Sequence, residues 1–416
     1  MIESFPTWTV VPFVTLVLGI AALPMLIPHL WGKLWFQAAV SAACAAPVIG
    51  FLVTESHVEH LTSSVASYAS FIATIGALYI VTSGIFVSGD IEATPRTNLV
   101  MVIGGAMLAS VIGTTGASVL MLRPLLRTNR QRVSRAHLVP FFILLVSNVG
   151  GLLTPLGDPP LLLGYLEGVP FLWTLRLFPY WALYIVVIGS IFFVVERRAY
   201  AEEPAAAKRA DRAEVVPLAL HGTFNVALLA GIVVAVLVPS PWREAGMIAI
   251  AVASYVLTKK DIHEKNGFSL MPIIEVAVIF AGIFVCLSPI EVLLVERAPS
   301  LPLHHPWQLF WCSGALSSVL DNAPTYAAFG ALARGLSRGA PGLVAGILPV
   351  HLAAISIGSV IMGATTYIGN GPNLVVKAIA ERAGYATPSF ARYAAIAIAV
   401  LVPIHLVTTA VLVWLE

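Results

Sequence analysis

Long apolar runs separated by short polar segments dominate the chain. A helix needs about 20 mainly apolar residues to cross a bilayer. Eight uninterrupted runs approach or reach that length, at residues 8–28, 35–54, 66–88, 177–195, 221–239, 244–258, 270–290 and 391–414. This pattern predicts an all-α, polytopic membrane protein.

Four further apolar stretches are interrupted by Gly, Pro, Thr, Asn or Asp. They are "VIGTTGASVLMLRP" (111–124), "SNVGGLLTPLGDPPLLL" (147–163), "SSVLDNAPTYAAF" (317–329) and "GATTYIGNGPNLVV" (363–376). Irregular backbone in a membrane survives only where it is buried in protein or lines a watery cavity, because lipid offers no hydrogen-bond partner. The four interruptions therefore predict a functional site.

The interruptions are arranged as a repeat. "TSGIFVSGD" (82–90) resembles "FAGIFVCLSP" (280–289), and an offset of 212 places Thr154 on Thr366, Gly157 on Gly369, Asp158 on Asn370 and Pro160 on Pro372. We expect two related halves, residues 1–195 and 221–416, joined by a hydrophilic cytoplasmic linker at 196–220. Re-entrant hairpins are expected at about 98–127 and 306–336, and broken helices at about 138–168 and 342–380.

Each half then has five crossings and one hairpin, and an odd number of crossings inverts the second half. Discontinuous helices in inverted repeats are the design of secondary transporters. With both termini outside, only five of the 23 basic residues fall on the outer side, namely Arg176, Arg243, Arg297, Arg334 and Arg338. The other 18 lie inside, as the positive-inside rule requires.

Composition narrows the class of protein further. The 416 residues are 58% hydrophobic and 11% charged, with a mean hydropathy of +0.91, far more apolar than soluble domains. A net charge of +2 gives no reason to expect nucleic-acid binding, and three cysteines in apolar runs suggest no disulfide framework. No P-loop, metal-ligand cluster or nucleophile elbow is present, so we expect neither a cofactor nor ATP-driven transport nor an enzyme.

Two acids lie inside the interrupted motifs, Asp158 and Asp321. A charge at the bilayer centre costs about 2.5 to 3.5 kcal/mol even on the most lenient scale, so such residues are functional by default. A carboxylate there can hold a small cation or be neutralised by a proton, since burial disfavours its charged form. The alternative is structural: Asp158 could close a turn, and Asp321 or Asn322 could cap a half-helix.

Oxygen atoms from neighbouring side chains would complete a shell suited to a hard cation. The candidate hydroxyl ligands are Thr114, Thr115, Ser118, Thr154, Thr325, Thr365 and Thr366, and the candidate amides are Asn148, Asn322, Asn370 and Asn373. Gly157, Gly369, Gly371, Pro160 and Pro372 are expected to set backbone geometry. Glu275 is expected near the interface, and His351 and His405 are expected to be packed or hydrogen-bonded.

The four motifs resemble those of the ion transporter superfamily. "GTTGASVLMLRPLLR", "SNVGGLLTPLGDPPLLLGYLEGV", "LSSVLDNAPTYAAF" and "GATTYIGNGPNLVVKAIAE" are most similar to NhaD-type sodium/proton antiporters and related citrate transporters, from about Tyr68 to Ala383. The resemblance implies a scaffold domain, a mobile transport domain carrying both hairpins, elevator-type alternating access and a homodimer. The Ser-Asn-Thr signature of the carboxylate-transporting branch is missing at both tips, Thr114–Ser118 and Asp321–Thr325.

We therefore expect a sodium/proton antiporter, with a Na⁺ site at Asp158 and Asp321, in a bacterial-type inner membrane. A sodium-coupled citrate or dicarboxylate transporter and an oxyanion permease stay open as alternatives. Against them, two aspartates would repel a carboxylate and no intramembrane Arg or Lys compensates. An intramembrane aspartyl protease is more remote, because its Tyr-Asp and Gly-x-Gly-Asp patterns are missing.

Overall fold

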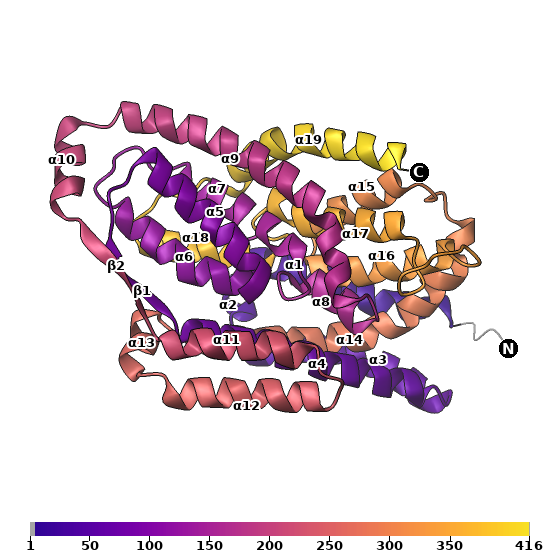
Figure 1. Ribbon diagram of the computed structural model, residues 1–416. Coiled ribbons are helices and arrows are strands. Elements are labelled where there is room, and N and C mark those ends of the chain that lie inside the picture. Colours follow the sequence, from indigo (N-terminus) through magenta and orange to yellow (C-terminus); the bar gives the residue numbers. More distant parts are fainter. Residues whose placement is uncertain (1–4, 416) are drawn as a thin grey trace.

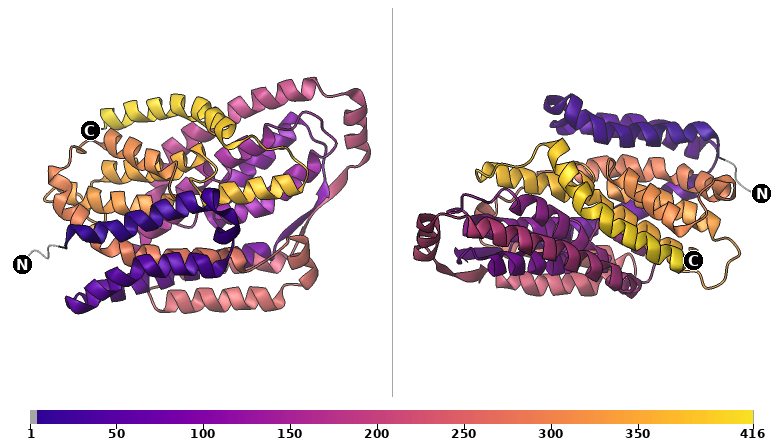
Figure 2. Two further views of the ribbon diagram at one scale, coloured as in Figure 1. Left: turned by 180° about the vertical axis from the view of Figure 1, so that it is seen from behind. Right: turned by 90° about the horizontal axis from the view of Figure 1, so that it is seen from above.

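The computed structural model describes residues 5–415, so residues 1–4 and 416 of the two predicted halves lie outside the described part. Most helices run along one long direction of the molecule (Figure 1). The N-terminal and C-terminal ends lie near the same end of that direction, and α10 lies at the opposite end (Figures 1 and 2).

The helices follow in a similar order before and after α10. The first set comprises η1 (Thr7–Thr9), α1 (Val10–Leu26), α2 (Pro28–Trp31), α3 (Leu34–Thr54), α4 (Val58–Ser83), α5 (Pro95–Ile112), α6 (Thr114–Thr128), α7 (Leu138–Leu145), η2 (Val149–Leu153), α8 (Pro159–Leu166), η3 (Phe171–Leu177) and α9 (Phe178–Ala201). After α10 (Ala205–Ala213) come α11 (Thr223–Val236), α12 (Trp242–Leu257), α13 (Lys260–Lys265), α14 (Met271–Arg297), η4 (Ala298–Ser300), α15 (Pro306–Ser317), α16 (Asn322–Leu336), α17 (Pro349–Met362), η5 (Gly363–Thr365), α18 (Gly371–Arg382) and α19 (Phe390–Trp414).

Several helices are long and apolar enough to span a membrane, which confirms a multi-pass membrane protein. Among the described residues there are 7, at Thr7–Leu26, Leu34–Thr54, Val58–Ser83, Pro95–Ile112, Phe171–Ala201, Met271–Ser300 and Phe390–Trp414. At the expected spans 221–239 and 244–258 lie α11 with 14 residues and α12 with 16, both shorter than the 7 candidate spans, which have 18 residues or more. The first arm of the predicted hairpin, α5, has the 18 residues that a span needs.

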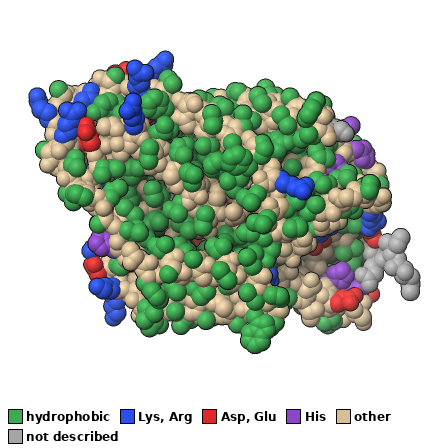
Figure 3. Space-filling view, in the orientation of Figure 1, with side chains coloured by type: hydrophobic (Ala, Val, Ile, Leu, Met, Phe, Trp, Pro, Cys, Tyr) green, Lys and Arg blue, Asp and Glu red, His purple; other side chains and the backbone are tan. Residues whose placement is uncertain are grey.

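The surface separates apolar from charged side chains, as a bilayer requires. In Figure 3 hydrophobic side chains cover the middle of the visible face, and Lys and Arg gather at the end where α10 and the neighbouring turns lie. Exposed residues such as Val100, Val186 and Val234 are each more than 60% exposed. In a soluble protein these side chains would face water, whereas lipid is the environment that favours them.

One prediction about secondary structure was wrong. A continuous span was expected at 66–88, but the helix there, α4, ends at Ser83. The residues that follow form strand β1 (Phe86–Asp90). This strand pairs antiparallel with β2 (Val216–His221), which begins in the linker expected at 196–220 and ends one residue beyond it. A Cβ at Gly222 would lie 2.0 Å from the carbonyl oxygen of Gly84, so the chain crosses itself there closely and needs glycine. Partners more than a hundred residues apart decide this ribbon, and local hydrophobicity does not reveal them.

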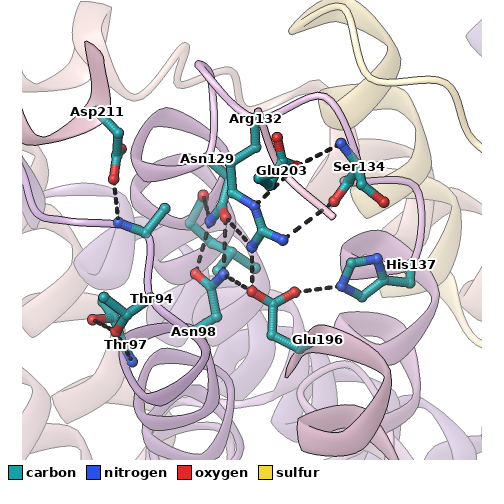
Figure 4. Close-up of polar contacts among 12 residues, drawn as sticks. Thr94, Thr97, Asn98, Asn129, Arg132, Ser134, His137, Glu196, Glu203 and Asp211 are labelled. Carbon is teal, nitrogen blue, oxygen red and sulfur yellow. Dashed lines mark hydrogen bonds and ion pairs between the residues drawn. The ribbon is translucent and has the colours of Figure 1, made fainter. Parts of the chain in front are cut away.

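A buried polar cluster joins the open ends of the first hairpin to its neighbours (Figure 4). Glu196 at the end of α9 is fully buried and forms an ion pair with Arg132. Its other contacts are Asn98 Nδ2, 2.7 Å from Oε1, and His137 Nε2, 2.5 Å from Oε2. The carboxylate thus connects α5, the loop after α6, the start of α7 and α9.

Removing the negative charge from this cluster should destabilise the protein. Glu196→Gln keeps the size of the side chain but removes the closer of the two buried carboxylates that pair with Arg132, the other being Glu203 at 3.5 Å. Breaking a buried ion pair costs about 3 to 5 kcal/mol. The expected result is a marked drop in the thermal unfolding midpoint of the purified protein in detergent. Glu202→Gln, on an exposed residue of the same segment, is the matched control and should leave the midpoint unchanged. Equal midpoints for both variants would contradict the anchoring role.

Candidate functional site

Both broken helices adopt the same local form. α7 gives way to η2, and α8 starts only after a turn at residues 154–157 and its extended N-cap, Asp158 (φ −146°, ψ 146°). In the second half α17 gives way to η5, and α18 starts after Asn370 (φ −152°, ψ 134°). The breaks therefore place an Asp and an Asn at equivalent helix N-termini, as the offset of 212 predicts.

One threonine fastens each break to the hairpin of its own half. Thr154 Oγ1 donates to the carbonyl oxygen of Ser110 on α5, and Thr366 Oγ1 donates to that of Ser318 at 2.5 Å, at the end of α15. Each hydroxyl also accepts a backbone N–H two residues further along its own break, at 3.2 Å. These hydroxyls thus satisfy backbone groups that the breaks leave free.

Asp158 is the point where both hairpin tips and the second break meet. Its carboxylate accepts hydrogen bonds from Thr114 Oγ1 (2.7 Å), Asn322 Nδ2 (2.5 Å) and Asn370 Nδ2 (3.3 Å). The residue is 2% exposed. Thr114 and Asn322 are the first residues of α6 and α16, so the donors come from the tips themselves.

The amides beyond Asp158 connect the two breaks. Asn370 Nδ2 also donates to Asn148 Oδ1 at 3.1 Å, and Asn148 Nδ2 donates to Asn373 Oδ1 at 2.8 Å. Asn373 Nδ2 in turn donates to the carbonyl oxygens of Gly363 (3.0 Å) and Thr366 (2.9 Å). This chain of amides holds the breaks together and surrounds Asp158 with polar atoms.

The second acid, Asp321, is placed differently. Its Oδ1 accepts the backbone N–H of Ala323 at 3.1 Å, so it caps α16 in the way weighed from the sequence. Thr325 Oγ1 donates to the Asp321 carbonyl oxygen at 2.9 Å within the same helix. The structure therefore brings Asn322, and not the Asp321 carboxylate, into hydrogen-bond contact with Asp158.

Some of the remaining candidate residues lie near the hydrogen bonds of Asp158, and others do not. Ser118 lies 2.9 Å from Ser147, close to the amide chain, whereas Thr115 and Thr365 are half-buried and lie outside the hydrogen bonds around Asp158. His405 is buried, and its Nδ1 lies 2.6 Å from the Tyr184 hydroxyl, so it is hydrogen-bonded as expected. Ser110, Ser147 and Ser318 were not predicted. Ser110 and Ser318 could have been found from the sequence, because an offset of 208 between the two hairpins aligns them.

Glycine is required at two of the three predicted positions. A Cβ at Gly157 would lie 2.3 Å from the Gly151 carbonyl oxygen, and a Cβ at Gly369 would lie 2.6 Å from that of Gly363. Around Gly371 a Cβ would meet no atom within 4 Å. Pro160 and Pro372 occupy the second positions of α8 and α18, where a helix loses nothing by lacking the proline N–H.

The electrostatic character of the site follows from these contacts. Every side chain that hydrogen-bonds to Asp158 is neutral, and the helices α6, α8, α16 and α18 all begin beside it. Helix N-termini carry a partial positive charge, which favours an anion. The anion that they surround is the protein's own carboxylate, so a proton or a cation is the partner that can neutralise it.

Two tips and two breaks thus surround one buried acid. A protein family described as "Putative citrate transport" matches residues 2–413. The chain belongs to this family. The match spans nearly the whole chain, which confirms the expected kinship with citrate transporters and a transporter in place of an enzyme. No curated protein sequence matches the chain.

The two glycines at the second break give a test of its geometry. Gly369→Ala forces a methyl group against two carbonyl oxygens, those of Gly363 and Ser317, each 2.6 Å from the added carbon. Such overpacking costs about 1 to 3 kcal/mol. We expect a lower unfolding midpoint and loss of transport. Gly371→Ala is the control, since its added carbon has open space and alanine favours the helix. Equal stability of the two variants would contradict the observed close approach.

Proposed function

We propose that this member of the citrate transport family is a cation/proton antiporter, most simply for Na⁺, with Asp158 as the carrier group. The observation that carries the proposal is the neutral hydrogen-bond shell of a buried carboxylate. Thr114, Asn322 and Asn370 each bring oxygen atoms as well as the donors that now bond Asp158. Small rotations of these side chains would present oxygens to a cation.

Exchange follows from competition for one group. A bound cation stabilises the charged carboxylate, whereas a proton makes it neutral, so the two ligands exclude each other. Oxygen ligands from carboxylate, hydroxyl, amide and carbonyl groups suit Na⁺ and other hard cations. The site offers all four kinds within the two tips and two breaks. The cycle needs no cofactor.

The architecture supports alternating access by an inverted repeat. Three helices, a hairpin, a broken helix and a final helix follow one another twice, as α1, α3, α4 through α9 and as α11, α12, α14 through α19. We propose that the hairpins and broken helices move together as a transport domain against a scaffold that includes α4 and α14, in a homodimer. The proposed setting is a bacterial-type inner membrane, with both termini outside.

A second function, cation-coupled transport of a carboxylate such as citrate, is favoured by the family match. Four helix N-termini around one pocket could also hold a carboxylate, provided that bound cations or protons first neutralise Asp158. No Arg or Lys hydrogen-bonds to the Asp158 shell within residues 5–415 to share that task. The antiporter is therefore the first proposal.

Substitution of the two acids separates their roles. In proteoliposomes with an internal pH dye, Asp158→Asn should abolish Na⁺-dependent proton movement, because the titrating group is lost while size and polarity are kept. Asp321→Asn should retain exchange, since Asn caps a helix about as well as Asp. Each variant is compared with wild type after addition of Na⁺, Li⁺, citrate or succinate.

The outcomes distinguish the two functions. Proton movement driven by Na⁺ or Li⁺ alone, lost only in Asp158→Asn, supports the antiporter. Proton or charge movement that requires citrate or succinate would instead support carboxylate transport. Normal exchange in Asp158→Asn would show that Asp158 is not the carrier group and would contradict the mechanism.

The orientation has its own test in intact cells. Single cysteines at Ser134 and Ala206, on the side that carries most basic residues, should resist an impermeant thiol reagent. A cysteine at the exposed Ser300, between α14 and α15, should react readily and serves as the control. The reverse labelling pattern would indicate the opposite orientation, with both termini inside.

A further inference from the structure

A polar cavity lies apart from the hydrogen bonds of Asp158. It has a volume of about 290 Å³ and lies between α4, α8, α14 and α16. Its polar lining comprises His60, Ser63, Ser64, Ser67, Glu167, Ser288, Glu291 and Arg334. At the end of the molecule near the N-terminus, Figure 3 shows a hollowed surface where acidic, basic and His side chains gather. A cavity of this size has room for several water molecules.

The cavity is in line with the Asp158 site. Leu163 of α8 and Ala327 of α16 form part of its wall. Each lies five residues after the site residue of its own helix, Asp158 or Asn322, which corresponds to about 7.5 Å along a helix axis. An ion leaving the cavity through this wall therefore has about one and a half helical turns to travel.

The charges of the cavity favour a cation. Arg334 forms an ion pair with Glu167, so these two charges compensate each other. Glu291 is the other acid in the lining, and its carboxylate forms no ion pair within the described residues 5–415. Among its carboxylates and guanidinium groups, the lining has two acids, Glu167 and Glu291, against one Arg, Arg334.

Glu291 also lies within a spanning helix. It is six residues before Arg297, the last residue of α14, or about 9 Å inside that end of the helix. An acid at such a position is costly unless a cavity, a partner or a function requires it. Ser64 and Ser67 of α4 and Ser288 of α14 supply hydroxyl oxygens to the same cavity. Carboxylate and hydroxyl oxygens are ligands that hard cations prefer.

We propose that Glu291 and the serines of α4 and α14 form an outer cation site, separate from Asp158, which binds a monovalent cation on its way between the outer solution and the transport site. The identity of the cation and its path to Asp158 rest on the proposed antiporter function. The binding of a cation at Glu291 does not depend on whether Asp158 exchanges that cation for a proton. The site adds selection for positive charge before the ion reaches the buried carboxylate.

Thiol chemistry inside the cavity measures this selection without requiring transport. Ser67→Cys is introduced after Cys44, Cys286 and Cys312 have been replaced by alanine, and the rates of reaction with a cationic and an anionic methanethiosulfonate reagent are compared. Glu291→Gln should lower the ratio of cationic to anionic rate about tenfold, because a unit charge a few ångströms away is lost. Na⁺ should slow the cationic reagent when Glu291 is present and have no effect in Glu291→Gln.

Two further variants make the result specific. Glu296→Gln removes a charge from the same helix outside the cavity lining and should leave both the ratio and the Na⁺ effect unchanged. Asp158→Asn should also preserve the Na⁺ effect, because the two sites are separate. Loss of the Na⁺ effect in Asp158→Asn, or a ratio in Glu291→Gln equal to wild type, would overturn the outer site. A Glu291-dependent Na⁺ effect without Na⁺-driven proton movement in wild type would retain the outer site and reject the antiporter.

Discussion

The carboxylate of Asp158 is the constraint on which the centre of this protein depends. A buried acid requires hydrogen-bond donors, and the chain supplies them from both hairpin tips and from the second break, through Thr114, Asn322 and Asn370. Placing donors from such distant segments around one group requires that α6, α8, α16 and α18 all begin at the same place. The breaks in the helices are therefore the means by which four N-termini reach a single point.

The same breaks create a second demand, because each one frees backbone groups that lipid cannot satisfy. Thr154 and Thr366 meet it by bonding the end of the neighbouring hairpin helix, and the amides of Asn148 and Asn373 join one break to the other. These side chains therefore hold the two breaks and the neighbouring hairpin helices together as one packed unit.

Charge is placed in layers along the molecule. Basic side chains gather at the end with α10, where Glu196 and Arg132 secure the open ends of the first hairpin (Figures 3 and 4). Neutral polar groups surround Asp158 in the middle, and the cavity with Glu291 lies beyond α8 and α16. The middle layer combines a buried carboxylate with donors from both hairpin tips and from the second break.

The sequence by itself determined the membrane class and the positions at which the helices are interrupted. The second hairpin was predicted at 306–336, where α15 and α16 lie, and the first at 98–127 against α5 and α6 at 95–128. These features follow from local composition, because a bilayer permits few ways to satisfy a backbone. The tertiary structure decided which acid is central. Asp158 and Asp321 both precede half-helices, yet one cap bonds its own helix while the other bonds partners 164 and 212 residues away. The strand pair and the cavity around Glu291 depend on equally distant contacts, which no local pattern encodes.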